Sequence, residues 1–111
     1  MARIRTIGTD AVQAMGDNDG RRAWTIIMPA TTIVAGNTGR VHVGLGFQPS
    51  TVVSAPDQGF ALVAGEQIGD EMIFEGDISV WQGSIWLRAN VAGQIVWIDE
   101  AIGGVAIAPT S

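Results

Sequence analysis

Residues that could carry out a reaction are few in this chain. It contains a single histidine, His42, and no cysteine. The histidine therefore lacks the partner that a catalytic triad needs and the further ligands that a zinc site needs. A cysteine nucleophile is absent. We expect His42 to lie on the surface of a strand. The sequence predicts no catalytic, cofactor-binding or metal-binding residue, no cofactor, and no enzymatic activity.

Two acidic patterns come closest to known sites, and each has the wrong spacing. The run GDNDG at residues 16–20 is similar to the middle of a calcium loop. An EF-hand would need an acidic ligand at position 15 and a glutamate near position 26, where Met15 and Ile26 stand. The carboxylates between Glu66 and Asp77 have no spacing typical of a glycosidase pair or a cation site. We interpret both patterns as surface turns and loops.

Charge is unevenly distributed along the chain. The net charge is -5, and all six basic residues are arginines. Residues 1–22 carry four arginines against three aspartates, a net of +1, and the rest carries two arginines against eight carboxylates, a net of -6. An acidic body disfavours binding to nucleic acid or to an anionic membrane. The arginine-bearing segment suits an acidic protein surface, or its charges are simply solvated.

Length and hydropathy indicate one domain that is made in a cytoplasm. At 111 residues the chain can bury roughly two-thirds of its unfolded surface in a single core. No apolar run resembles a signal peptide or approaches the roughly 20 residues that span a bilayer. We therefore expect a soluble protein with no membrane partner.

The N-terminal part is the least globular in sequence. Ile4 and Ile7 are its apolar anchors, and GDNDGRR at residues 16–22 is rich in turn-forming residues. We predict a flexible N-terminal arm over residues 1–22, extended until it docks against a partner. Residues 23–111 then form the folded domain.

The run from Asp77 to Ile98 predicts the centre of a sheet. It holds three of the four tryptophans, and its apolar residues alternate in three short blocks, the pattern of half-buried strands. We predict three antiparallel strands in a meander, joined at Gln82-Gly83 and at residues 90–93. The inward residues would be Ile78, Val80, Ile85, Leu87, Ala89, Ile95 and Trp97, with Trp86 and Arg88 on the opposite face.

Four other segments read as strands. Residues 23–35 form two short strands or an edge strand broken at Pro29. In residues 40–47, Val41 and Val43 would face one side and Arg40 and His42 the other. Residues 59–66 are apolar enough on both faces to be largely buried. The apolar tail, residues 101–111, forms a last strand or lies in a subunit interface.

About eight short strands, glycine-rich connections and no convincing helix predict an all-β fold. The expected architecture is an antiparallel β-sandwich, jelly-roll-like, with an extended N-terminal arm.

Three short blocks in this order resemble small β-sandwich virion structural proteins of tailed bacteriophages, of the capsid decoration or head-fibre type. They are NTGRVHVG at residues 37–44, GFALVAGE at 59–66, and ISVW at 78–81 followed by IVWIDE at 95–100. The resemblance spans about residues 25–100, and the strand containing Trp86 departs from it. It implies a virion structural protein on the phage head surface, commonly a homotrimer, with no catalytic residues.

These observations lead to one functional hypothesis and one alternative. The first is a capsid decoration (cement) protein that binds and stabilises the head as an oligomer, with the major capsid protein as partner and the arm adding a strand to that protein. Its candidate capsid contacts are Arg3, Ile4, Arg5, Ile7, Arg21 and Arg22. Its candidate subunit-interface residues are Trp81, Trp86, Trp97, Ile102, Val105 and Ile107. The alternative is a tail-fibre, spike or head-fibre module whose exposed tryptophans stack on receptor glycans.

Overall fold

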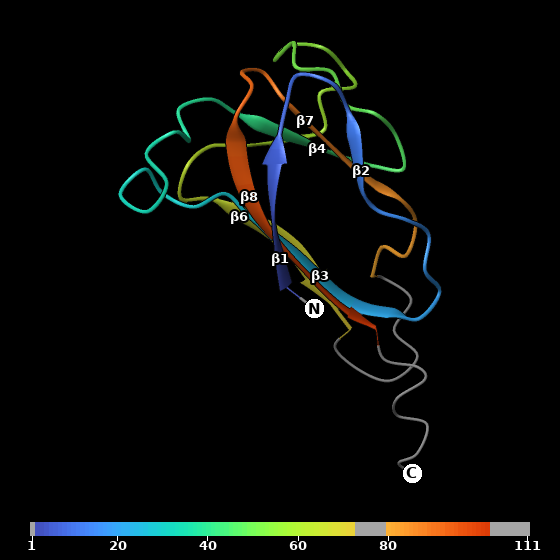
Figure 1. The fold of residues 1–111 in the computed structure, drawn as a ribbon. Coiled ribbons are helices and arrows are strands. Elements are labelled where there is room, and N and C mark those ends of the chain that lie inside the picture. Colours follow the sequence, from blue (N-terminus) through green and yellow to red (C-terminus); the bar gives the residue numbers. More distant parts are fainter. Residues whose placement is uncertain (1, 73–79, 103–111) are drawn as a thin grey trace.

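The computed structural model describes residues 2–72 and 80–102, which form eight strands in two antiparallel four-stranded sheets (Figure 1). The all-β sandwich that the sequence predicts is confirmed. No helix in this part of the chain is long and apolar enough to cross a membrane. The strands are β1 (Ala2–Ile7), β2 (Val12–Met15), β3 (Arg21–Ile27), β4 (Val41–Leu45), β5 (Phe60–Leu62), β6 (Gln67–Glu71), β7 (Ile85–Ala89) and β8 (Gln94–Ile102).

The strand order is that of a jelly roll. One sheet, the β1 sheet, has the order β1-β8-β3-β6, and the other, the β2 sheet, has the order β2-β7-β4-β5. The first strand pairs with the eighth, the second with the seventh, the third with the sixth and the fourth with the fifth. The chain is thus one long antiparallel hairpin, rolled so that successive pairs enter opposite sheets. Contacts between β3 and β8 and between β4 and β7 complete the two sheets.

The core lies between the sheets and is built from alternate residues of the strands. In β7 the residues Ile85, Leu87 and Ala89 are buried while Trp86 and Arg88 face outward, as predicted. Each large buried side chain contributes about 1.5–3 kcal/mol relative to an exposed one. This alternation fixes which face of each sheet is left for other contacts.

Strand β8 alternates in the opposite phase to the one predicted. Val96 and Ile98 are buried in the core, and Ile95 and Trp97 face outward. Both sets are apolar, so hydropathy alone does not choose between them. The buried amide of Gln94 accepts a hydrogen bond from the Gly39 N–H at 2.8 Å, which places the even-numbered residues of β8 inside.

The predicted meander is wrong, because β7 and β8 belong to different sheets. The connection between them crosses the sandwich instead of closing a hairpin. Asn90 holds it to the start of β4 by accepting a hydrogen bond from the Arg40 N–H at 2.6 Å, and Gly93 turns with a φ of 88°. The strand predicted around Ile78 lies outside the described residues, and Val80 is buried.

The predicted flexible arm is also wrong, since residues 2–7 form β1 along β8 and residues 12–15 form β2 along β7. Without them β8 and β7 would each present unpaired backbone groups at a sheet edge, and Ile7 and Met15 would leave the core. The sandwich therefore begins at residue 2, not residue 23.

Two further strand predictions need correction. Residues 23–35 give one strand only, because β3 ends before Pro29, and β3 lies inside its sheet between β8 and β6. Strand β5 is an edge strand, so Phe60 and Ala61 are exposed and only Leu62 is buried.

Candidate functional site: an apolar groove on the β1 sheet

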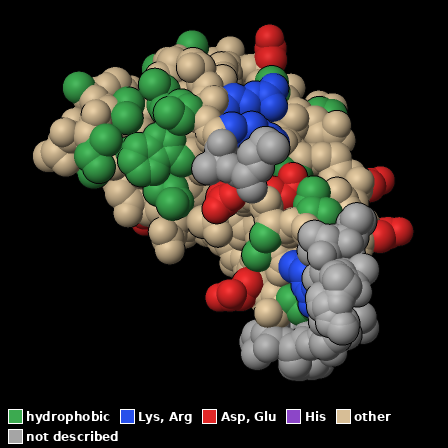
Figure 2. Space-filling model, turned by 60° about the horizontal axis from the view of Figure 1, so that its bottom comes forward, with side chains coloured by type: hydrophobic (Ala, Val, Ile, Leu, Met, Phe, Trp, Pro, Cys, Tyr) green, Lys and Arg blue, Asp and Glu red, His purple; other side chains and the backbone are tan. Residues whose placement is uncertain are grey.

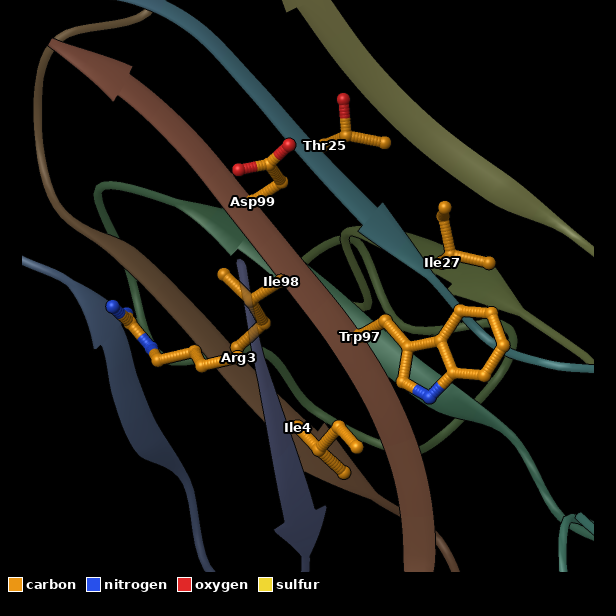
Figure 3. Close-up of a pocket in the computed structure, with 7 residues that line it drawn as sticks. All are labelled: Arg3, Ile4, Thr25, Ile27, Trp97, Ile98 and Asp99. Atoms are coloured by element: carbon orange, nitrogen blue, oxygen red, sulfur yellow. The ribbon is translucent and has the colours of Figure 1, made fainter. Parts of the chain in front are cut away.

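Three apolar side chains form a row across the outer face of the β1 sheet. The register places Trp97 of β8 opposite both Ile4 of β1 and Ile27 of β3. They border an open groove of about 430 Å³, also lined by Arg3, Thr25, Ile98 and Asp99 (Figure 3). Ile4 is 72% exposed. An apolar row at the middle of an outer sheet face is unusual, because that face normally carries polar residues.

The groove continues toward β6 as a more polar hollow. Thr25 lines both, and the hollow, of about 410 Å³, extends over Gly69 to Asp70 and Glu71. A Cβ atom at Gly69 would lie 2.4 Å from the Trp24 carbonyl oxygen, so the close approach of β3 and β6 here requires glycine. The absent side chain keeps the face open beside Thr25.

The outer face of the β2 sheet is different, because the loop of residues 46–59 is hydrogen-bonded to its side chains. The Nε2 of His42 accepts from the Arg40 guanidinium at 3.3 Å, so Nδ1 carries the proton and donates to the Gln58 carbonyl at 2.9 Å. Arg40 also donates to the Thr51 carbonyl at 3.3 Å. His42 is consequently buried, and the prediction of a surface histidine is wrong.

Apolar side chains gather at one end of the surface seen in Figure 2, beside arginine side chains and apart from most carboxylates. Contiguous exposed apolar surface commonly marks a site of contact with another protein. The row of Ile4, Trp97 and Ile27 lines a groove.

Arg3 and Arg5 lie along one open side of the sandwich. They alternate with Ile4, share the inward phase of buried Ile7, and donate to backbone carbonyls of β2. The bond from Arg5 to the Gln13 oxygen is 3.1 Å long, and Arg3 donates to the Ala14 oxygen. Charged side chains along two edge strands discourage a further strand from adding there. These arginines are therefore not carried on a free arm.

Arg21, a candidate capsid contact, is fully buried and serves as an internal clamp. Its Nε lies 2.7 Å from the Glu100 carboxylate. Its other nitrogens donate to the carbonyls of Gly16 at 2.7 Å, Gly83 at 2.8 Å and Trp81 at 3.2 Å. The guanidinium thus joins the turn before β3, the segment before β7 and strand β8. It is not placed to touch a partner.

The remaining capsid-contact candidates lie in different environments in the fold. Ile7 is buried in the core, Arg22 is half-buried and Ile4 is at the groove. Ile4 therefore joins Trp97, although the sequence assigned these two residues to different partners.

The other tryptophans do not reach the groove. The Trp81 ring packs on Gly83, where a Cβ atom would lie 2.8 Å from it, and its Nε1 donates to the Ser84 carbonyl at 2.9 Å. Trp86 is half-buried on the outer face of the β2 sheet. Ile102 is 49% exposed at the end of β8, and Val105 and Ile107 lie outside the described residues.

Over residues 2–72 and 80–102, no three histidine, aspartate or glutamate side chains gather to hold a metal ion. In the GDNDG run, Asn18 accepts a hydrogen bond from the Gly20 N–H at 2.8 Å, as in an ordinary Asx turn.

Sequence reasoning missed Ile27, Thr25 and Asp99 as members of the site. The available signal was a strand pair with apolar residues in both phases, at residues 24–27 and 95–98, because such strands place apolar side chains on both faces of a sheet. No family model, curated protein or solved structure matches this chain.

Proposed function

We propose that this chain is a virion structural protein of a tailed bacteriophage, a capsid decoration (cement) protein that binds the head surface as an oligomer. The observation that carries the proposal is the open groove formed by Ile4, Trp97 and Ile27. Covering an exposed isoleucine with protein contributes about 1.5–3 kcal/mol, so this face is stabilised by a protein neighbour. Its work is adhesion, with no reaction of its own.

The fold suits this role. Jelly rolls recur in viral capsid proteins and in lectins, where two packed sheets form a rigid block. Here the Arg21 clamp fixes the segments at one end, and Arg3 and Arg5 tie together β1 and β2. A rigid block keeps its contact surface preorganised, which lowers the entropic cost of binding.

The proposed partners are other copies of this chain, as a homotrimer, and the major capsid protein. The groove is the proposed contact between subunits. Arg3, an exposed residue that lines the groove, is the proposed contact with carboxylates of the shell. Oligomerisation would strengthen head binding through multivalency even when each single contact is weak.

Co-sedimentation with phage heads assembled without this chain tests the proposal. The wild-type protein should bind to saturation with a fixed number of copies per head. Ile4→Asp should weaken binding by about tenfold or more, equivalent to about 1.4 kcal/mol, because it places a charge in the groove. Val52→Asp, at a site 61% exposed on another surface, is the matched control. A wild-type protein that stays in the supernatant would refute head binding.

A receptor-binding or glycan-binding module is the second candidate, favoured by one observation. Trp97 lines a groove that also holds the polar groups of Asp99 and Thr25. An aromatic ring with hydrogen-bonding neighbours suits a sugar face. Quenching of tryptophan fluorescence by a glycan, lost in Trp97→Phe plus Asp99→Asn, would support this candidate. No response across a broad glycan array would reject it.

A further inference from the structure

We infer that the groove of the β1 sheet receives the C-terminal segment, residues 103–111, of a neighbouring copy of this chain. The inference rests on the proposed function, because it names the partner that occupies the same surface. It is carried by the chemistry of the segment, by where β8 ends, and by how far the segment can reach.

The segment and the groove match in chemistry. The sequence of residues 103–111 is GGVAIAPTS, without a charged side chain, and Val105 and Ile107 lie two positions apart. In an extended chain two such residues project on the same side, about 7 Å apart. The groove offers apolar walls from three neighbouring strands, and its charged side chains are Arg3 and Asp99. An extended apolar segment is the kind of ligand that such a groove binds.

Strand β8 ends at Ile102, beyond the groove of its own chain. Trp97 and Ile102 lie on the same strand, five positions apart, a separation of about 17 Å. Ile102, the last residue of β8, is 49% exposed. To reach its own Trp97, the segment would have to reverse completely and run back along β8.

A segment that reversed in this way would not bring its apolar residues as far as the groove. A tight reversal at Gly103-Gly104 would place Val105 opposite Ile102 and Ile107 opposite Glu100. Ile107 would then stop three residues short of Trp97, about 10 Å along the strand. Val105 and Ile107 would therefore not reach the groove of their own chain. The groove of a second copy carries no such constraint.

Charge favours a second copy at this face in particular. Each copy has a net charge of -5, so two copies repel each other over most of their surfaces. An uncharged segment entering an apolar groove avoids that repulsion. Because segment and groove lie at different places on one chain, head-to-tail contacts close as a ring, and a reciprocal exchange between two copies closes as a two-fold pair.

Sedimentation equilibrium on full-length variants, without heads, tests the inference. The tail variant is Val105→Asp with Ile107→Asp, and the groove variant is Ile4→Asp. The control, Val52→Asp with Val53→Asp, adds the same two charges at exposed loop positions. The wild type and the control should sediment as the same oligomer, and both other variants at the monomer mass of 11.6 kDa. An equimolar mixture of the tail and groove variants should form a heteromer, since one supplies an intact groove and the other an intact segment.

Three results would overturn the inference. The first is a wild type that is monomeric at about 100 μM, a concentration well above the Kd of stable assemblies. The others are a tail variant that keeps the wild-type mass and a mixture of the two variants that stays monomeric. A tail variant that remains oligomeric while Ile4→Asp dissociates would reject the segment as the occupant and retain the groove as the contact. Failure of the proposed function is read separately, as a wild-type oligomer that does not bind heads.

Discussion

Arg21 and Glu100 form an ion pair across the β1 sheet, with 2.7 Å between Nε and Oε2, and the arginine is fully buried. A buried charge is tolerated only when it is paired and its donors are satisfied. Three backbone carbonyls complete that requirement. The pair thus holds together segments that are distant in sequence.

Replacing Arg21 should be among the most destabilising single changes in the chain. Arg21→Met leaves Glu100 without this partner and removes the donor to three carbonyls, so the free energy of unfolding should fall by about 3–5 kcal/mol. Urea denaturation followed by tryptophan fluorescence measures it. Arg5→Met is the control and should cost about 1 kcal/mol, because it removes one hydrogen bond near the surface. Equal losses in the two variants would contradict the clamp.

Asn37 should be required to hold the loop before β4 against β8. Its buried amide accepts from the Ile95 N–H at 2.7 Å and donates to the carbonyls of Ile95 and Pro29, each at 3.0 Å. Asn37→Asp keeps the shape and removes both donors, so stability should fall by about 2–3 kcal/mol. Hydrogen exchange at the Ile95 amide should accelerate in step with that loss. Unchanged protection at Ile95 would show that the loop is held by other contacts.

Substitution by alanine should have very different effects on stability at two glycines. A Cβ atom at Gly44 would lie 2.1 Å from the Phe47 carbonyl oxygen, whereas one at Gly16 meets nothing within 4 Å. Gly44→Ala must displace backbone and should cost about 3 kcal/mol or more. Gly16→Ala should change stability by less than about 1 kcal/mol. Thermal unfolding of the pair checks this, and a folded, fully stable Gly44→Ala would show that the turn after β4 can move.

Much of the fold could be predicted from the sequence because strand periodicity is local. The alternation in residues 85–89 correctly gave both the strand and its buried face, and turn-rich spacing gave the sandwich. The partner of each strand was not predictable in this way. In a jelly roll β1 pairs with β8, and the residues of neither strand indicate which strand it pairs with.

The errors have specific physical causes. Residues 1–22 were interpreted as an arm because residues 16–22 are rich in turn-forming residues, but β1 pairs with β8, and Arg3 and Arg5 donate to the backbone of β2. The phase of β8 depended on Gln94 and a loop far away in sequence. The burial of His42 depended on a loop that folds back over its strand.

The groove was half predicted. Trp97 was identified as an interface residue and Ile4 as a contact residue, each from its own segment. Their meeting follows from the β1–β8 register, which is a long-range pairing.

The most direct test of the account is whether the groove is covered by another subunit when the protein is assembled. The chain has no cysteine, so Ile4→Cys and Val52→Cys each introduce a unique thiol at an exposed position. Maleimide labelling of the two variants is compared in dilute protein and in the assembled oligomer on heads. The account predicts that assembly slows labelling at residue 4 by about tenfold or more, the protection expected from about 1.4 kcal/mol of contact, and leaves residue 52 unchanged. Equal labelling of residue 4 before and after assembly would contradict it.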